Sequence, residues 1–218
     1  MKKIFTTLAA LTMLVFASNA YAEIKFGISA AYTNIDASGS ETENTEKTSK
    51  DVSSKALIPS IFVEYGLTDS ISVGLDYIPF KADISDKTHT RTDVETSVAG
   101  NGLTTALNRV QTAEASIKNA TTLYGTFDLG PMYLKAGLAY FDLSTGDSLA
   151  TGSKYGNEDV YGGVIGLGVE QDKMRIEVLY TDYEDIALSS SVARTGVTVN
   201  NKIDADMDTL AVKLSYVF

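Results

Sequence analysis

Apolar and polar residues alternate along the last nine positions of the chain. Every second residue is apolar, and the residues between are small or charged with the single exception of Val217; the apolar set is Leu210, Val212, Leu214, Tyr216 and Phe218, and the set between is Ala211, Lys213 and Ser215. Successive side chains of a β-strand point to opposite faces. The pattern therefore predicts a strand with one apolar, aromatic face and one small or charged face.

The same alternation recurs along the chain and predicts eight strands, near residues 24–35, 56–66, 71–82, 115–128, 132–143, 159–170, 174–187 and 206–218. The connections between them alternate in length. Those at 67–70, 129–131 and 171–173 are tight, whereas those at 36–55, 83–114, 144–158 and 188–205 are long and polar. This regularity is typical of an antiparallel up-and-down sheet with all its long connections at one end.

The second long connection has a different pattern. Leu103, Leu107 and Val110 are spaced at i, i+4 and i+7, as on one face of a helix. The spacing favours a short helix near residues 103–115. The alternative is that the fourth strand simply begins earlier.

The N-terminus has the features of a secretory signal peptide. Lys2 and Lys3 precede an apolar stretch over residues 4–16, and the small-residue site Ala20-Tyr21-Ala22 follows. We therefore expect residues 1–22 to be a signal peptide and residues 23–218 to form one domain. No apolar run in residues 23–218 reaches the length of a transmembrane helix. The absence of cysteine excludes disulfides and thiolate chemistry.

The two faces of the predicted strands differ in charge. The apolar face carries Phe26, Ile28, Tyr32, Ile61, Val63, Tyr65, Ile71, Val73, Leu75, Tyr77, Leu123, Phe127, Met132, Leu134, Leu138, Tyr140, Tyr161, Ile165, Leu167, Val169, Met174, Ile176, Val178, Tyr180 and the apolar set of residues 210–218. The opposite face carries five basic and five acidic residues, which sum to zero: Lys25, Glu64, Asp76, Lys118, Asp128, Lys135, Glu170, Arg175, Glu177 and Lys213.

An uninterrupted apolar face suits contact with lipid, where a charge at mid-membrane would cost about 2–4 kcal/mol. Open sheet edges cannot be satisfied in lipid, so the sheet must close on itself. We therefore predict an all-β fold, an eight-stranded antiparallel up-and-down transmembrane β-barrel. The alternative is a soluble antiparallel sandwich, which does not require connections that alternate long and short.

The net charge lies mainly outside the predicted strands. Removal of residues 1–22 takes away two lysines and no acid, so the formal charge of −10 becomes −12. Many acids fall in long connections or at strand tips: Asp36, Glu41, Glu43, Glu46, Asp51, Asp182, Glu184, Asp185, Asp204, Asp206 and Asp208. This charge argues against nucleic acid as a partner. The acids at 204, 206 and 208 lack the glycine and distal glutamate of a calcium loop. Two interpretations of these acids remain: they bind divalent cations loosely, or they form a solvated acidic rim.

Two stretches resemble small outer-membrane β-barrel proteins, the family of OmpA-, OmpX- and OmpW-like barrels and opacity-type porins. They are the hairpin at residues 64–77, with its Tyr65-Gly66-Leu67-Thr68-Asp69 turn, and the terminal residues 213–218. The resemblance implies the outer membrane of a Gram-negative bacterium, with outer-membrane lipid and lipopolysaccharide as surroundings. It also implies that Leu214, Tyr216 and Phe218 form an assembly signal that the barrel-assembly machinery recognises. Periplasmic chaperones would deliver the chain to that machinery.

Eight strands leave an interior filled by side chains or one small ligand, which excludes a general diffusion porin. Charges in so narrow a lumen must be paired. We therefore expect a non-enzymatic barrel with a charge-plugged lumen and acidic surface loops, acting in envelope integrity or surface interaction. The resemblance to OmpW-like barrels implies the alternative, a narrow conduit for small solutes.

A third hypothesis is a lipid-modifying enzyme. His89 is the only histidine, and Ser85, Asp86 and Asp93 lie near it in sequence. These residues are therefore candidates for a catalytic triad. Polar loops supply such neighbours by chance, however. We expect no catalytic residue, no cofactor site and no dedicated metal site.

Overall fold

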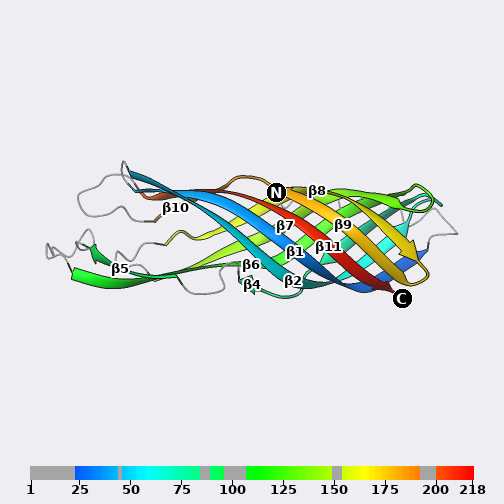
Figure 1. The fold of residues 1–218 in the computed structure, drawn as a ribbon, viewed down its shortest axis with the longest axis horizontal. Coiled ribbons are helices and arrows are strands. Elements are labelled where there is room, and N and C mark those ends of the chain that lie inside the picture. Colours follow the sequence, from blue (N-terminus) through cyan, green and yellow to red (C-terminus); the bar gives the residue numbers. More distant parts are fainter. Residues whose placement is uncertain (1–22, 44–45, 84–88, 96–106, 149–153, 192–199) are drawn as a thin grey trace.

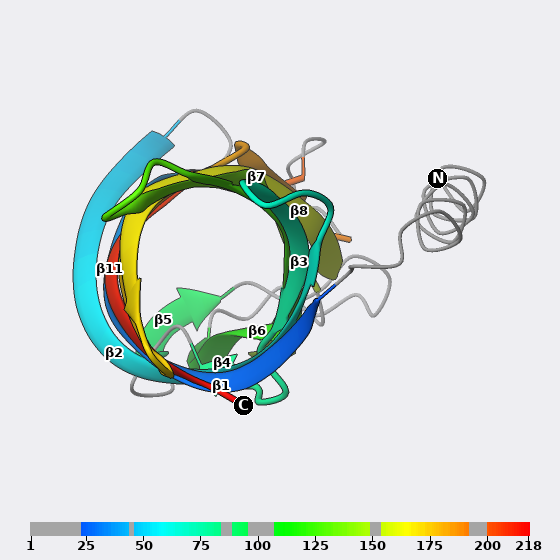
Figure 2. The same ribbon diagram turned by 90° about the vertical axis from the view of Figure 1, so that its right-hand side faces the viewer.

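The computed structural model describes residues 23–43, 46–83, 89–95, 107–148, 154–191 and 200–218. In these residues the chain forms a closed antiparallel barrel (Figures 1 and 2). Its strands are β1 (Ile24–Glu43), β2 (Glu46–Gly66), β3 (Ile71–Tyr77), β4 (Ala82–Asp83), β5 (His89–Glu95), β6 (Leu107–Asp128), β7 (Tyr133–Ser148), β8 (Asn157–Gln171), β9 (Met174–Tyr183), β10 (Ile186–Ser189) and β11 (Lys202–Val217).

Eight of these strands follow one another around the barrel in the order β1-β2-β3-β6-β7-β8-β9-β11, and β1 pairs with β11 to close it. The short strands β4 and β5 add to β6, and β10 adds to β11. The eight-stranded antiparallel up-and-down barrel predicted from the sequence is confirmed. No helix among the described residues is long and apolar enough to cross a membrane.

The closing ladder between β1 and β11 runs from Gly27 opposite Val217 to Thr42 opposite Lys202. Just beyond it, the Phe218 backbone N–H donates to the Phe26 carbonyl at 2.9 Å, and the two aromatic rings stack with centroids 5.8 Å apart. The end of the chain is thus held against the first strand.

Alternation of exposed and buried positions separates the outer face from the lumen. Along β8, for example, buried or half-buried residues regularly follow exposed ones, and Tyr161, Ile165, Leu167 and Val169 are all exposed. Tyr65 differs from its prediction: it is buried, because alternation fails at the end of β2, where Glu64 and Tyr65 are both buried.

The strands extend much further at one end than the sequence pattern predicts. β1, β2 and β6 have 20, 21 and 22 residues, whereas a membrane needs about 9–11. Most of residues 36–55, expected as a loop, continue the β1–β2 ladder as far as Glu43 opposite Glu46. Figure 1 shows these extensions at the left; we call this the hairpin end and the other, with turns at 67–70, 129–132 and 172–173, the tight-turn end.

The helix expected near residues 103–115 is wrong for the part that the structure describes. Residues 107–115 belong to β6, and β5 pairs with them from Glu95 opposite Leu107 to His89 opposite Ala113. Backbone pairing with β5 supplies the hydrogen bonds that a helix would otherwise make within itself. Residues 103–106 lie outside the described residues, as do the signal peptide at 1–22 and the pair Ser85 and Asp86.

The barrel wall is interrupted between β2 and β3. β3 was expected to reach residue 82 but ends at Tyr77, which pairs with Ile61 of β2. Beyond this pair, residues 46–60 of β2 are paired on the β1 side only. Pro59 and Pro79 each lie two residues past the last pair, and proline cannot donate a ladder hydrogen bond. The two prolines therefore mark the point where β2 and β3 separate.

Candidate functional site: a charge network in the lumen

The lumen near the tight-turn end is crossed by ion pairs between residues on different strands. The residues are Lys25 of β1, Glu64 of β2, Asp76 of β3, Lys135 of β7, Glu170 of β8, Arg175 and Glu177 of β9, and Lys213 of β11. We call these eight residues the lumen network. Strand alternation turns each of them inward, so seven strands contribute to one cluster whose formal charges cancel.

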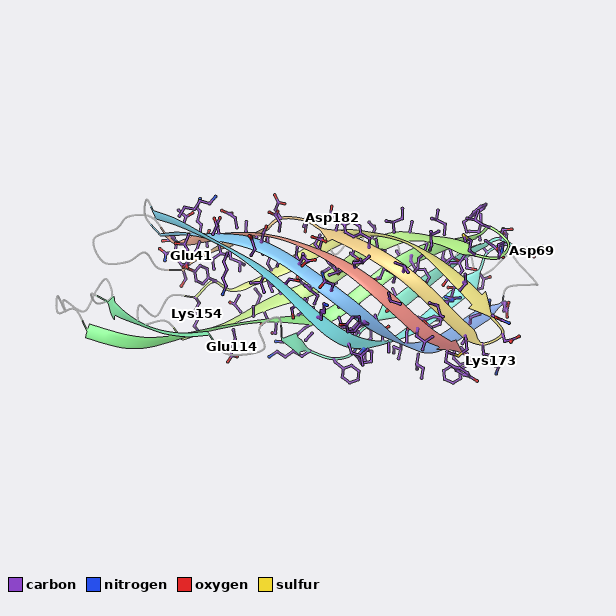
Figure 3. All side chains as sticks on the ribbon, viewed as in Figure 1. Glu41, Asp69, Glu114, Lys154, Lys173 and Asp182 are labelled. Atoms are coloured by element: carbon purple, nitrogen blue, oxygen red, sulfur yellow. The ribbon has the colours of Figure 1, made fainter. Side chains whose placement is uncertain are left out.

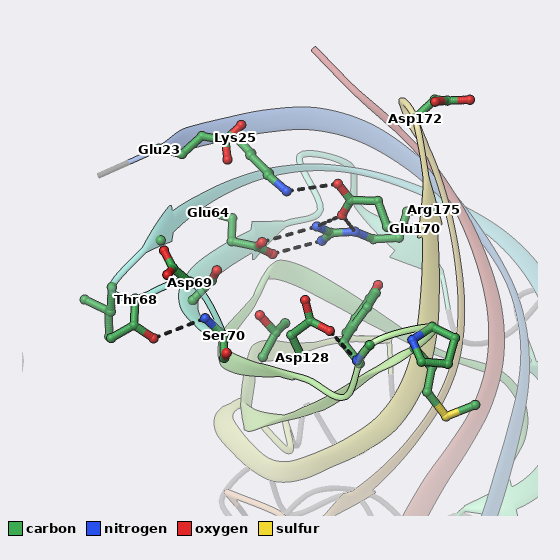
Figure 4. A pocket seen from close by; sticks show the side chains of 18 residues that line it. Glu23, Lys25, Glu64, Thr68, Asp69, Ser70, Asp128, Glu170, Asp172 and Arg175 are labelled. Atoms are coloured by element: carbon green, nitrogen blue, oxygen red, sulfur yellow. Dashed lines mark hydrogen bonds and ion pairs between the residues drawn. The ribbon is translucent and has the colours of Figure 1, made fainter. Parts of the chain in front are cut away.

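Arg175 is the most connected member of the lumen network. Its Nη1 and Nη2 donate to the two Glu64 oxygens at 2.9 and 3.2 Å, and its Nη2 and Nε donate to Glu170 Oε2 at 2.6 and 3.1 Å. Lys25 Nζ donates to Glu170 Oε1 at 2.9 Å (Figure 4). Lys25 and Glu170 are each about a quarter exposed, whereas Arg175 and Glu64 are buried.

Two further ion pairs lie within the same lumen. Lys135 Nζ donates to Glu177 Oε1 at 3.0 Å, with 2% and 1% of these residues exposed. Lys213 Nζ donates to Asp76 Oδ2, and this pair is buried as well. Charges removed from water to this extent are tolerated only with close partners. Every cation of the lumen network has a carboxylate partner.

Aromatic rings complete the packing around the cations. Lys135 Nζ lies 3.7 Å from the centre of the Tyr124 ring, and the Tyr124 hydroxyl donates to Glu64 Oε2 at 3.1 Å. Arg175 Cζ lies 5.3 Å from the Phe62 ring and 5.1 Å from the Tyr133 ring. Cations within about 6 Å of a ring centre are attracted by its π-electrons. These three aromatic residues were not singled out from the sequence, although their inward positions in the alternation could have identified them.

Glycines on neighbouring strands make room for these rings. A Cβ atom at Gly74 would lie 2.3 Å from Tyr124 Cζ, and one at Gly168 would lie 2.3 Å from Tyr133 Cζ. Such contacts are far closer than atoms can pack. The aromatic rings therefore cross the lumen over glycines.

Two of the ten predicted lumen charges lie outside the lumen network. Lys118 is exposed on the outer side, because a register shift between Lys118 and Thr121 of β6, with Asn119 at φ 53°, reverses the alternation. Its Nζ donates to Ser144 Oγ at 3.4 Å. Asp128 is exposed at the rim, where its Oδ1 accepts from the Gly130 backbone N–H at 2.7 Å.

The lumen toward the hairpin end has a different character from the polar inner face that the sequence predicted. It is filled by a buried apolar cluster of Phe141, Leu143, Val160, Ile186, Leu188 and Met207. The described lumen therefore has two zones, one charged and one apolar.

The tight-turn end contains a cavity of about 580 Å³ below the lumen network. Lys25, Glu64, Glu170 and Arg175 of the network line it. Further carboxylates lie around it on different elements: Glu23, Asp69, Asp128 and Asp172 (Figure 4).

The fold resembles solved bacterial outer-membrane proteins. The outer membrane protein OprG from Pseudomonas aeruginosa matches with a TM-score of 0.52 and 15% identity over 89% of this chain and 95% of that chain. The outer membrane protein AlkL, solved in lipid bilayers, matches with a TM-score of 0.50 and 13% identity over 92% and 93%. The expected resemblance to small outer-membrane barrels is thus confirmed as a likeness of fold. No protein-family model matches the sequence, and no curated protein does.

Proposed function

We propose that this chain is a non-enzymatic integral protein of the bacterial outer membrane whose lumen is plugged by the lumen network. The long hairpins would act outside the cell in envelope integrity or surface interaction. The observation that carries the plug is that all four cations of the network, Lys25, Lys135, Arg175 and Lys213, bond to carboxylates on other strands of a narrow barrel.

The location in the outer membrane is supported by the fold and by the apolar outer face. Exposed large apolar residues occur on all eight strands of the barrel, for example Phe26, Ile61, Leu75, Phe127 and Leu138. In barrels of this kind short turns face the periplasm and long connections face outward. The tight-turn end would then be periplasmic, and the hairpin end would meet lipopolysaccharide.

Loose binding of divalent cations at the hairpin end is part of this proposal. Asp208 of β11 lies opposite both Asp36 of β1 and Asp182 of β9. Like charges directly opposite each other destabilise a sheet, and cations would offset this. Among the described residues no group of three or more acidic, histidine or cysteine side chains could hold a metal ion, so we propose bridging to neighbouring anions rather than a dedicated site.

A narrow conduit for small solutes is the second candidate. The interruption of the wall favours it, because residues 46–60 of β2 have no strand neighbour on the β3 side among the described residues. A solute that cannot pass the lumen network could leave through this gap.

Swelling of proteoliposomes separates the two candidates. The plug predicts that liposomes containing the wild-type protein swell no faster in glycine or arabinose than protein-free liposomes. Arg175→Ala should increase swelling, because it removes the only cation paired with Glu64 among the described residues and one of the two cations paired with Glu170. Rapid swelling with the wild-type protein would contradict the plug and support the conduit.

A further inference from the structure

We propose that the outer face of the barrel between β2 and β6 binds a phosphate group of lipopolysaccharide, the phosphorylated glycolipid of the outer leaflet. This inference rests on the outer-membrane location proposed above and assigns the residues that the lipid contacts. The distribution of charge around the barrel, a β-bulge and two exposed apolar side chains support it together.

Tyrosines lie where the apolar outer face ends toward the hairpin end. Five strands carry one, and we call them the tyrosine girdle: Tyr32 of β1, Tyr77 of β3, Tyr140 of β7, Tyr161 of β8 and Tyr180 of β9. Tyrosine is enriched where a membrane meets water, at the level of the lipid headgroups. Charged residues just beyond this girdle would therefore lie beside the phosphate groups of outer-leaflet lipid.

The charges just beyond the tyrosine girdle change sign around the barrel. Five successive strands carry an outward aspartate there, which we call the acidic sector: Asp142 of β7, Asp159 of β8, Asp182 of β9, Asp208 of β11 and Asp36 of β1. The rest of the circumference carries exposed lysines, which we call the basic sector: Lys118 of β6, Lys81 before β4 and Lys55 of β2. A phosphate group is attracted to the basic sector and repelled by the acidic one.

The β-bulge in β6 places one of these lysines in the basic sector. Asn119 has a φ of 53°, and the register shift at this point turns Lys118 outward instead of into the lumen. Ala82 pairs with Ile117, so Lys81, the residue before Ala82, comes opposite Lys118. Like charges opposite each other destabilise a sheet, and a phosphate group between the two lysines offsets their repulsion.

The acidic residue beside Lys118 is engaged with other donors. Asp142 lies opposite Lys118 in the β6–β7 ladder. Its two oxygens accept hydrogen bonds from the Tyr140 hydroxyl and from Asn119 Nδ2. Neither Lys118 nor Lys55 forms an ion pair within the ranges that the structure describes. Two cations of the basic sector are therefore available to an anionic ligand.

Two exposed apolar side chains flank the wall interruption in the same part of the barrel. Leu57 of β2 is 71% exposed, more than any other large apolar side chain that the structure describes, and Phe80 is 58% exposed. Leu57 precedes Pro59 and Phe80 follows Pro79, so the two lie on opposite sides of the point where β2 and β3 separate. Apolar side chains beside cations suit a ligand that carries both phosphate groups and acyl chains, which a free phosphate ion lacks.

Native mass spectrometry of the full mature protein in non-ionic detergent tests the site, with bisphosphorylated lipid A as the probe. EDTA is present throughout, so that divalent cations cannot link the lipid to the acidic sector. We expect saturable binding that weakens at least about tenfold in Lys81→Gln/Lys118→Gln, because each lysine near an anionic lipid adds to the attraction. Lys81→Arg/Lys118→Arg keeps both charges and should bind like the wild type. The matched control, Lys47→Gln/Lys50→Gln, removes the same charge from exposed hairpin-end residues and should also bind like the wild type.

A second pair of variants tests the apolar contact without altering charge. Phe80→Ala should bind lipid A several-fold more weakly, whereas Leu138→Ala, which truncates an exposed side chain of β7, should not. Equal weakening within either matched pair would reduce the effect to overall charge or overall hydrophobicity and overturn the site. So would phosphatidylglycerol binding as tightly as lipid A through the same lysines. Membrane fractionation of cells tests the location separately: protein in the outer-membrane fraction together with any of these results would overturn the site alone.

Discussion

Lys135 donates one hydrogen bond to Glu177 across the lumen. Only 2% of Lys135 and 1% of Glu177 is exposed. Their charges are useful to the fold only as a pair, because a lone charge in this environment would have neither water nor a counter-ion. Arg175 extends the same principle to two carboxylates and two aromatic rings. Single residues in this lumen therefore have effects that depend on their partners.

Removing one member of a pair should cost far more than removing both. We expect Lys135→Ala to lower the free energy of unfolding by about 3–5 kcal/mol, because Glu177 is left buried and unpaired. The double variant Lys135→Met/Glu177→Gln should cost much less. Urea unfolding in detergent measures the free energy of unfolding of both variants. Intrinsic tyrosine fluorescence can follow the transition, because the chain contains no tryptophan. Equal losses in the single and double variants would contradict the large cost assigned to an unpaired Glu177.

Asp206, at the hairpin end, has another acid, Asp185, as its neighbour instead of a counter-ion. A hydrogen bond and charge repulsion from Asp185 hold the pKa of Asp206 above its usual range. A raised pKa in the folded state means that the contribution to stability is fully present below the unfolded pKa and is lost as the pH rises through the folded pKa. At pH 7 the ionised pair is therefore unfavourable.

Asp206→Asn should raise the melting temperature at pH 7 and change it little at pH 3, where the wild-type carboxyl is protonated. Added Mg²⁺ should narrow the difference at pH 7 if cations screen these acids. Thermal melts followed by circular dichroism test this. A variant that melts below the wild type at pH 7 would contradict the repulsion.

Among the strands, the ends at the tight turns were predicted closely and the ends at the hairpins were not. β1 begins at Ile24 and β9 at Met174, as expected, because apolar outward residues begin there. β2 was expected from residue 56 but begins at Glu46. Residues 36–55 of the extended β1–β2 hairpin are mostly polar on both faces, so hydrophobic alternation no longer indicates a strand there. Lys118 was misplaced for a related reason, since a register shift within β6 leaves no mark in the hydrophobic pattern.

The final strand closes the barrel, and Phe218 holds its end. The Phe218 ring stacks on Phe26 and meets Tyr216 edge-on at 5.3 Å. Deleting Phe218 should reduce the folded protein in the outer membrane by at least about half, since aromatic pairs and their buried area contribute on the order of 1 kcal/mol or more. Heat-modifiable mobility on gels measures the folded fraction. The substitution Asp51→Ala at the exposed hairpin end provides a comparison, and equal folded amounts in both variants would rule out an assembly role for Phe218.

For the whole molecule, the separation of tight turns from long hairpins would set the orientation of the barrel in the proposed outer-membrane location. Figure 3 shows Asp69 and Lys173 at one end and Glu41, Glu114 and Lys154 at the other. If the tight turns face the periplasm, protease added to intact cells should cut only in the hairpin end, near Lys154 for trypsin. Cleavage at Lys173 in intact cells would reverse the orientation.

The charged and the apolar zone of the lumen both depend on how the whole barrel closes. Sequence alternation could place charges inward, but which of them meet depends on barrel closure, which brings Lys25 of β1 to Glu170 of β8. Five residues of the apolar cluster lie within the predicted strands, and their apolar side chains at inward positions could have indicated the cluster; only Leu188 falls in a segment expected as a loop.

Single-channel recording in planar lipid bilayers tests the plugged lumen most directly. The wild-type protein should give little or no steady current in 1 M KCl, because the lumen network and the apolar cluster occupy the interior in series. Arg175→Ala should give transient openings, since it leaves Glu64 without its cation and Glu170 with Lys25 alone. Large, steady currents from the unmutated protein would contradict the account.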